Sequence, residues 1–197
     1  MKIAMLARNP NLYSHQRLQQ AAEDAFALAG FNGAAVVIDP RSGELLALVS
    51  LPAYDPNAFA LGIDQSTWDA LNKDPLRPLN NRALREYNSP GSTFKIAMAV
   101  AALEEGIITP DFRVACRGGA SFYGRFFQCH TTHGSVDLRE ALEQSCNTYF
   151  YTLGEMMEID QIHKWATALG LGELSGIDLP YEVRGLMPSS AWKREER

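Results

Sequence analysis

The chain has 197 residues, which is enough for one sizeable domain with its own core. Its hydrophobic content of 46% and charged content of 21% are typical of a globular protein and exclude a disordered tail. The 18 basic and 23 acidic side chains give a net charge of −5, which argues against nucleic acid as a main partner because phosphate binding needs a basic surface. The apolar run at residues 3–7 is too short for a signal-peptide core or a membrane span, so neither is expected.

The first third of the chain predicts a helix followed by a β-hairpin. Residues 14–29 have helical periodicity, with Ser14 as the expected cap and with Ala22, Phe26 and Leu28 among the apolar positions. Two β-rich runs then flank a turn at residues 39–43. Because both runs are almost entirely apolar, we expect the hairpin to lie deep in a covered sheet.

The rest of the chain alternates helices with irregular segments. We expect a proline-punctuated loop at residues 51–62, a short capped helix at 66–74 and a helix at 97–105 that stops at Gly106. Residues 110–134 have little periodicity and allow a small hairpin. Helices are predicted again at 135–157, capped by Ser135 or Asp137, and at 160–172, before a turn-rich tail. The aromatic residues expected in the core are Trp68, Trp165, Tyr149, Phe150 and Tyr151.

Ser92 and Lys95 are the first candidate catalytic pair. Residues three apart on a helix share a face, so the hydroxyl and the amine can approach each other where the apolar helix begins. A serine hydroxyl needs a neighbouring base, and a lysine serves as that base only when burial and the positive helix end favour its neutral form. The helix end also stabilises an oxyanion through its unpaired N–H groups. The alternative interpretation is a helix cap followed by a surface lysine.

The S-x-x-K spacing is weak evidence alone, because Ser190 and Lys193 also match it near the end of the chain. We assign that second match no catalytic role, since no apolar helix follows it. A second polar segment strengthens the first match. Ser145 can relay a proton, and the Asn147 amide can hold a peptide backbone and position the lysine. Taken alone, this segment is better interpreted as a polar helix junction.

The segments "SPGSTFK" and "SCN", in this order, resemble the first two motifs of the penicillin-recognising serine enzymes, S-x-x-K and S-x-N. Their flanks resemble the transpeptidase domain of class B penicillin-binding proteins, and within that family the elongation-type group, penicillin-binding protein 2. The resemblance covers residues 13–197, leaving 1–12 as an unmatched segment. It implies an α+β fold, with an antiparallel sheet covered by helices as in serine β-lactamases. It also implies that Ser92 is the acylated nucleophile, Lys95 its base, and Ser145 and Asn147 the relay and the peptide clamp.

The third family motif, K-T-G, is not found at any lysine of this sequence. The lysines are Lys2, Lys73, Lys95, Lys164 and Lys193. In the family that motif lines the other wall of the cleft, and family chains also begin earlier with a membrane anchor. We therefore expect a C-terminally incomplete transpeptidase domain. Two alternatives remain open: a β-lactamase or β-lactam sensor of the same fold, and a truncated fragment without catalysis.

The resemblance further implies the ligands, the partner and the location of the protein. The expected ligands are peptidoglycan stem peptides and β-lactam antibiotics, and acylation needs no cofactor. In the full-length family a membrane glycosyltransferase of the elongation machinery is a partner, and the domain lies on the extracytoplasmic (periplasmic) face of the bacterial inner membrane. A nucleic acid partner is not expected.

A cysteine- and histidine-rich segment lies between the two motifs. Cys116, Cys129 and His133 carry the sulfur and imidazole ligands that suit zinc, with His130 or an aspartate as a fourth ligand. Some elongation-type penicillin-binding proteins resemble this segment and have a small structural metal site near the cleft. A disulfide between the two cysteines, or free thiols, would also fit. Cys146 is expected to be a buried small hydrophobe.

Overall fold

The computed structural model describes residues 12–60 and 62–195, and these divide into two compact units. One unit spans Met1–Glu86 and Pro180–Val183, and the other spans Tyr87–Leu179 and Arg184–Arg197. The segment predicted to be unmatched, residues 1–12, lies outside the described residues except for its last residue.

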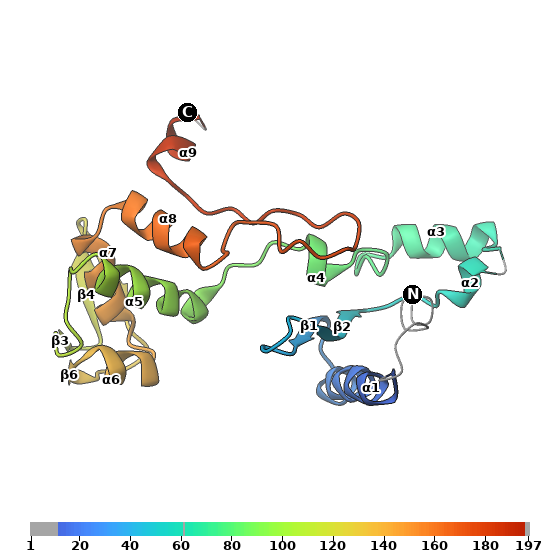
Figure 1. Cartoon of the computed structure of the whole chain (residues 1–197), viewed down its shortest axis with the longest axis horizontal. Coiled ribbons are helices and arrows are strands. Elements are labelled where there is room, and N and C mark those ends of the chain that lie inside the picture. The colour runs from blue at the N-terminus through green and yellow to red at the C-terminus, as the bar shows by residue number, and fades with distance from the viewer. Residues whose placement is uncertain (1–11, 61, 196–197) are drawn as a thin grey trace. The chain divides into compact units, whose positions relative to one another are not determined.

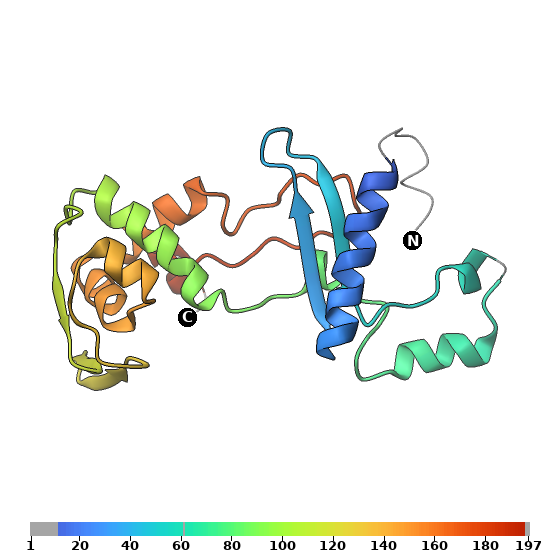
Figure 2. The ribbon, with the colours of Figure 1, turned by 90° about the horizontal axis from the view of Figure 1, so that it is seen from below.

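The first unit is built on a helix and a β-hairpin. Helix α1 (Leu12–Ala29) runs along the antiparallel pair β1 (Gly33–Ile38) and β2 (Leu45–Leu51), as Figure 2 shows. The side-chain amide of Gln19 ties α1 to β2, because it accepts from the Leu48 N–H at 2.9 Å and donates to the Leu48 carbonyl at 3.1 Å. The predicted helix and hairpin are confirmed. The predicted Ser14 cap is wrong, because the helix already begins at Leu12.

The expectation of a deeply covered hairpin holds for β2 only. Ala47 and Val49 are 4% and 1% exposed, whereas Val36 and Ile38 on β1 are 46% and 54% exposed. An apolar strand is buried on both faces only where other elements cover both. In the described residues this hairpin has α1 and α4 (Arg82–Arg85) as its main neighbours, which leaves every second β1 side chain exposed.

Short helices complete this unit. They are α2 (Asn57–Ala60) and α3 (Gln65–Lys73), followed by α4. The predicted cap of α3 is provided by Asp64, whose carboxylate accepts from the Thr67 N–H at 2.9 Å. The chain later returns to α4, where the Val183 N–H donates to the Leu84 carbonyl at 2.9 Å. Trp68, expected in the core, is 40% exposed on α3.

The second unit is mainly helical (Figure 1). A 3₁₀ turn, η1 (Gly91–Phe94), leads into α5 (Lys95–Glu104). Helices α6 (Leu138–Glu143), α7 (Asn147–Met156) and α8 (Ile159–Ala168) follow, and α9 (Ser190–Glu195) ends the described chain. The α5 face that packs against α7 and α8 carries small residues, among them Ala101 and Ala102, both fully buried. Small side chains let the helices approach closely. The larger Tyr149 and Leu153 side chains of α7 pack in the same core as these alanines and are fully buried. Tyr151, also expected there, is 40% exposed.

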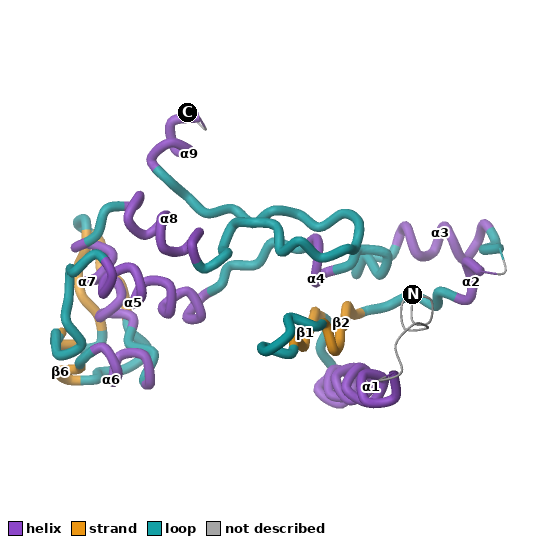
Figure 3. Tube along the Cα trace, viewed as in Figure 1, coloured by secondary structure: helices purple, strands orange, loops and turns teal. Residues whose placement is uncertain are grey.

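The irregular segment between α5 and α6 contains two small antiparallel ladders. β3 (Val114–Cys116) pairs with β6 (Gly134–Val136), and β4 (Gly119–Phe122) forms a hairpin with β5 (Arg125–Gln128). The predicted small hairpin is thus confirmed. The predicted turn-rich tail is confirmed at residues 175–189, which contain no helix or strand (Figure 3), whereas the helix predicted to reach residue 172 already ends at Ala168.

Helices and antiparallel strands together give the α+β class that the sequence predicts. In the described residues the strands form three two-stranded antiparallel sheets. None of the helices in residues 12–60 and 62–195 is both long and apolar enough to span a bilayer.

Candidate active site

Ser92 lies in the turn that precedes α5. Pro90 and Gly91 make that turn, with Gly91 at a φ of 55°, a left-handed conformation that glycine adopts without strain. The Thr93 hydroxyl closes the turn by donating to the Pro90 carbonyl at 2.6 Å. Ser92 is exposed and lies in η1, three residues before the first residue of α5. This places the hydroxyl where a ligand can reach it.

Lys95 is the first residue of α5 and is only 9% exposed. Its Nζ donates to three oxygens of the S-C-N segment: the Ser145 carbonyl at 2.7 Å, Ser145 Oγ at 2.9 Å and Asn147 Oδ1 at 2.7 Å. Burial lowers the pKa of Lys95, and the electrostatic interaction with the nearby sulfurs of Cys129 and Cys146 offsets only part of this effect. The amine therefore loses its proton more readily than a solvent-exposed lysine.

The S-C-N segment is a break between two helices. The sequence predicts one helix over residues 135–157, but α6 ends at Glu143 and α7 begins at Asn147. Ser145 has a φ of 51°, a left-handed conformation that costs a non-glycine residue energy. This break directs both the Ser145 hydroxyl and its carbonyl toward Lys95. Of the two predicted caps, Asp137 is the correct one, and it forms a capping box with Glu140.

The four predicted catalytic residues are brought together in one hydrogen-bonded chain. Lys95 Nζ donates to Ser145 Oγ at 2.9 Å, and Ser145 Oγ donates to Ser92 Oγ, also at 2.9 Å. The spacing of Ser92 and Lys95 predicts a direct approach between them, yet in the described residues their hydrogen-bonded connection passes through Ser145. The reason is that Lys95 is held by three acceptors on the S-C-N segment.

Cys116, Cys129 and His133 also come together, and Cys146 joins them. Their ligand atoms, three sulfurs and one ring nitrogen, all lie within 4.8 Å of one another. His133 Nδ1 faces Cys116 Sγ at 3.4 Å and Cys129 Sγ at 3.6 Å. All three cysteines are buried and free, so this structure contains no Cys116–Cys129 disulfide. His130, considered as a fourth ligand, is exposed and is not part of this group.

The electrostatics of this cluster fit a metal ion. Burial alone would raise the pKa of the Cys116 thiol, but hydrogen bonds from Thr148, His133 and Gly118 outweigh it and lower that pKa to about 5. Burial raises the pKa of Cys146 to about 12, because charge on the neighbouring sulfurs adds to it. Three sulfurs and one imidazole are a zinc-type donor set, and a bound cation would stabilise all three as thiolates. The sequence prediction missed Cys146, although its place inside the S-C-N motif ties it to the same helix start.

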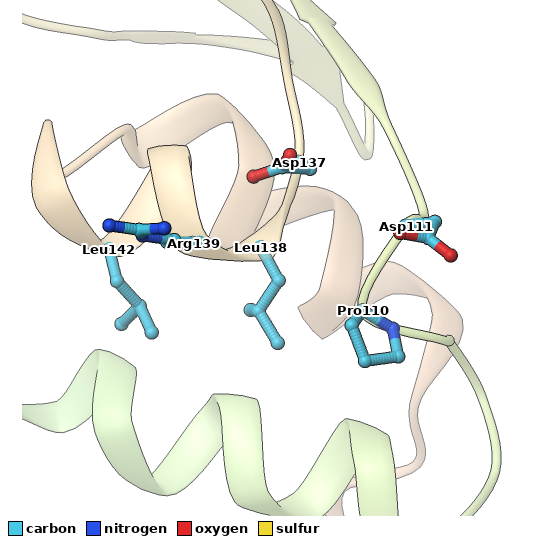
Figure 4. Close-up of a pocket in the computed structure, with 6 residues that line it drawn as sticks. All are labelled: Pro110, Asp111, Asp137, Leu138, Arg139 and Leu142. Atoms are coloured by element: carbon cyan, nitrogen blue, oxygen red, sulfur yellow. The ribbon is translucent and has the colours of Figure 1, made fainter.

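The described chain also has an open hollow of about 440 Å³ beside the start of α6 (Figure 4). It is lined by Pro110, Asp111, Asp137, Leu138, Arg139 and Leu142. None of these is one of the four candidate catalytic residues, so we assign the hollow no part in the chemistry.

Comparisons with known proteins match the chain to a family. The sequence profile described as "Penicillin binding protein transpeptidase domain" matches residues 33–196. The chain is 41% identical over 175 residues to the peptidoglycan D,D-transpeptidase MrdA of Acinetobacter baumannii, covering 86% of this chain and 26% of that protein. It is 40% identical over 183 residues to MrdA of Escherichia coli strain K12, covering 91% of this chain and 29% of that protein. The chain thus spans less than a third of the length of these relatives.

Solved structures agree with the sequence matches. PBP2 of Pseudomonas aeruginosa superposes with a TM-score of 0.85 at 42% identity, covering 91% of this chain and 40% of that one. Since the family profile covers most of the chain and the fold agrees with that of PBP2, the α+β transpeptidase fold expected from the sequence is confirmed. The chain belongs to the penicillin-binding protein transpeptidase domain family and is similar to MrdA, the elongation-type PBP2.

Proposed function

We propose that this chain carries the acylation centre of a D,D-transpeptidase that cross-links peptidoglycan. The observation that supports this most directly is the hydrogen-bonded chain from Lys95 through Ser145 to Ser92. A serine nucleophile needs a connected base, and a buried lysine with a lowered pKa is such a base. In this proposal Asn147 holds the lysine on one side and the substrate peptide backbone on the other.

The proposed reaction begins with neutral Lys95. Both hydroxyls then turn so that Ser92 donates to Ser145 and Ser145 donates to Lys95. As Ser92 Oγ bonds to the carbonyl carbon of a terminal D-Ala-D-Ala unit, its proton passes to Ser145 while the Ser145 proton passes to Lys95. The amide bond breaks, the departing D-Ala amine takes a proton back along this chain, and an acyl-serine remains. An amine from a neighbouring stem peptide then bonds to the acyl carbon and gives a proton to the same hydrogen-bonded chain, and as the ester bond breaks Ser92 Oγ takes up that proton.

The same centre would react with β-lactams, which present a strained amide to Ser92. A similar solved structure, at 33% identity, is that of penicillin-binding protein A from Mycobacterium tuberculosis as an imipenem acyl-enzyme. Another, at 34% identity, is PBP2 from Helicobacter pylori in complex with MreC. By analogy, we propose that this domain acts on the extracytoplasmic side of the inner membrane, with partners of the elongation machinery that include a membrane glycosyltransferase.

We also propose a structural zinc ion held by Cys116, Cys129, Cys146 and His133. The donor set and the mutual distances support it. When bound, the ion would hold β3, the segment after β5 and the start of α7 together, and it would take no part in acylation. His133 Nε2 is buried without a partner in the described residues, which fits a ring oriented by Nδ1 at the metal.

The test is covalent labelling of this 197-residue chain with a fluorescent penicillin. We expect a stable label that maps to Ser92 and is lost in Ser92→Ala. Ser190→Ala is the matched control, because it removes the serine of the other S-x-x-K match and should label like the wild type. No label on Ser92 would overturn the acylation proposal. A label that disappears within one reaction cycle would instead indicate a β-lactamase.

A further inference from the structure

The second residue of α7 is a buried hydroxyl that contacts the sulfur cluster. Thr148 is 1% exposed, and its Oγ1 lies 3.3 Å from Cys116 Sγ. The preceding residue contributes as well, because the Asn147 N–H donates to Cys129 Sγ at 3.2 Å. The first turn of α7 thus contacts two of the three sulfurs, and the residue that caps it, Cys146, carries the third.

The same turn of helix also reaches the acylation centre. The Asn147 side chain accepts from Lys95 Nζ at 2.7 Å, while its backbone N–H contacts Cys129. Residues 145–148 therefore face the sulfur cluster on one side and the lysine on the other. Any shift of this turn relative to the cluster moves Asn147 Oδ1 relative to Lys95.

Chemistry decides the direction of the Thr148 hydrogen bond. Between a thiol and a hydroxyl either atom can donate. A metal-bound sulfur has no proton, so Thr148 must then donate to Cys116. Hydrogen-bond donors around metal ligands orient those ligands, and their loss typically weakens metal affinity by about 10- to 100-fold.

We propose that Thr148 is a positioning residue, whose hydroxyl donates to the Cys116 thiolate and thereby fixes the first turn of α7, with Asn147, against Lys95. This inference rests on the zinc site and the acylation centre proposed above. Thr148 touches no reacting atom; it acts through Cys116 and through the helix that it shares with Asn147.

Three variants of the full 197-residue chain test it. Thr148→Val removes the hydroxyl and keeps the branched shape, and Thr148→Ser restores the hydroxyl. Thr152→Val is the matched control, because Thr152 lies one turn further along α7 and donates to the Thr148 carbonyl at 2.9 Å, away from the cluster. Each variant is titrated with Co²⁺, whose thiolate absorption reports the ligand set, and with Zn²⁺ against a chelating dye.

We expect Thr148→Val to weaken zinc affinity by about 10- to 100-fold and to shift the cobalt–thiolate band. Thr148→Ser should recover both, and Thr152→Val should match the wild type. At saturating zinc, Thr148→Val should slow the bond-forming step with a fluorescent penicillin more than it weakens the preceding non-covalent binding. This pattern separates a positioning role from a general loss of folding.

The outcomes are distinguishable. A Thr148→Val chain with wild-type zinc affinity and an unchanged cobalt band overturns the Thr148 proposal and leaves the zinc site standing. A defect that Thr148→Ser does not rescue also overturns it, because packing rather than the hydroxyl would then be responsible. A wild-type chain that binds neither metal overturns the zinc site and this inference together. If Ser92 takes no label in the wild type, the acylation proposal fails, while the cobalt spectra still decide whether Thr148 orients Cys116.

Discussion

Two opposing effects act on the Lys95 amine. Three oxygen acceptors surround Nζ, and the Phe150 ring lies 5.6 Å away, all of which favour the ammonium form. Burial favours the neutral form, and its effect is larger, so the pKa of Lys95 lies below its usual 10.5. The acceptors thus hold the lysine in place, while burial makes its neutral, proton-accepting form easier to reach than in a solvent-exposed lysine.

The first prediction concerns the pH dependence of acylation. Because only neutral Lys95 accepts the Ser92 proton, the labelling rate should rise with pH through the pKa of this lysine. Since burial lowers that pKa, the rise should be centred below pH 10.5, the ordinary value for lysine. The measurement is the second-order rate constant for a fluorescent penicillin across the stable pH range. A rate that does not change with pH would contradict Lys95 as the base.

A second prediction concerns the relay. Ser145→Ala removes the hydroxyl between Lys95 Nζ and Ser92 Oγ, so the acylation rate constant should fall by about 10²- to 10⁴-fold. Ser121→Ala, an exposed serine on β4, is the control and should leave the rate unchanged. Stopped-flow labelling measures both. If Ser145→Ala acylates at the wild-type rate, Lys95 must reach Ser92 without the relay.

The residues of this site could be predicted from the sequence, but the order of the hydrogen bonds among their side chains could not. Ser92, Lys95, Ser145 and Asn147 follow from motif spacing and from the apolar helix behind the first pair. The passage of the hydrogen bonds through Ser145 depends on its φ of 51°, and a helical pattern gives no sign of that conformation. Cys146 was missed for the same reason, since only the break between α6 and α7 turns its sulfur toward Cys116.

At the scale of elements, Glu105 joins α5 to α8. Its carboxylate accepts from Lys164 Nζ at 2.6 Å, from Trp165 Nε1 at 2.7 Å and from Gln161 Nε2 at 3.2 Å. The hydrogen bond from Lys164 is the largest cause of a lowered Glu105 pKa, followed by the one from Trp165. This fixes the end of the helix that begins with Lys95.

The third prediction follows from the sign of this shift. The pKa of Glu105 is lower in the folded than in the unfolded chain, so its stabilisation is present above the ordinary pKa of 4.5 and is lost as pH falls below it. Glu105→Gln should therefore lower the melting temperature at neutral pH and by less in acid. Glu104→Gln, the exposed neighbour on α5, is the control. Equal melting curves for Glu105→Gln and wild type at pH 7 would contradict the link.

Some helices were predicted better than the packing around them. The bounds of α3 and α5 follow closely from caps, glycines and periodicity, which are local signals, whereas α8 was predicted to run to residue 172 and ends at Ala168. The burial of β1 was predicted wrongly, because an apolar sequence does not indicate which other elements pack against the strand. Trp68 and Tyr151 were misplaced for the same reason, as each lies on the exposed side of its helix.

At the scale of the whole molecule, the two units differ in what stabilises them. All four sulfur and nitrogen atoms of the cluster belong to the unit that spans Tyr87–Leu179 and Arg184–Arg197. The other unit relies on α1, the β-hairpin and the return of the chain at Val183. A ligand stabilises only the state that binds it, so the zinc ion proposed above would add about 4 kcal/mol to the stability of the unit that carries the cluster, at about a thousand times its Kd.

The last prediction uses this difference. Removing zinc with a chelator should increase amide hydrogen exchange in β3 and in the first turn of α7 by up to about a thousand-fold. Without the metal, local unfolding of these segments no longer requires the release of a bound ion. Amides of β1 and β2 should exchange as before, and this comparison within one sample controls for the chelator itself. Hydrogen–deuterium exchange with mass spectrometry resolves these segments. If both units lose protection together, zinc stabilises the chain as a single cooperative body; if neither does, the cluster contributes nothing to folding, and its cysteines are merely buried thiols.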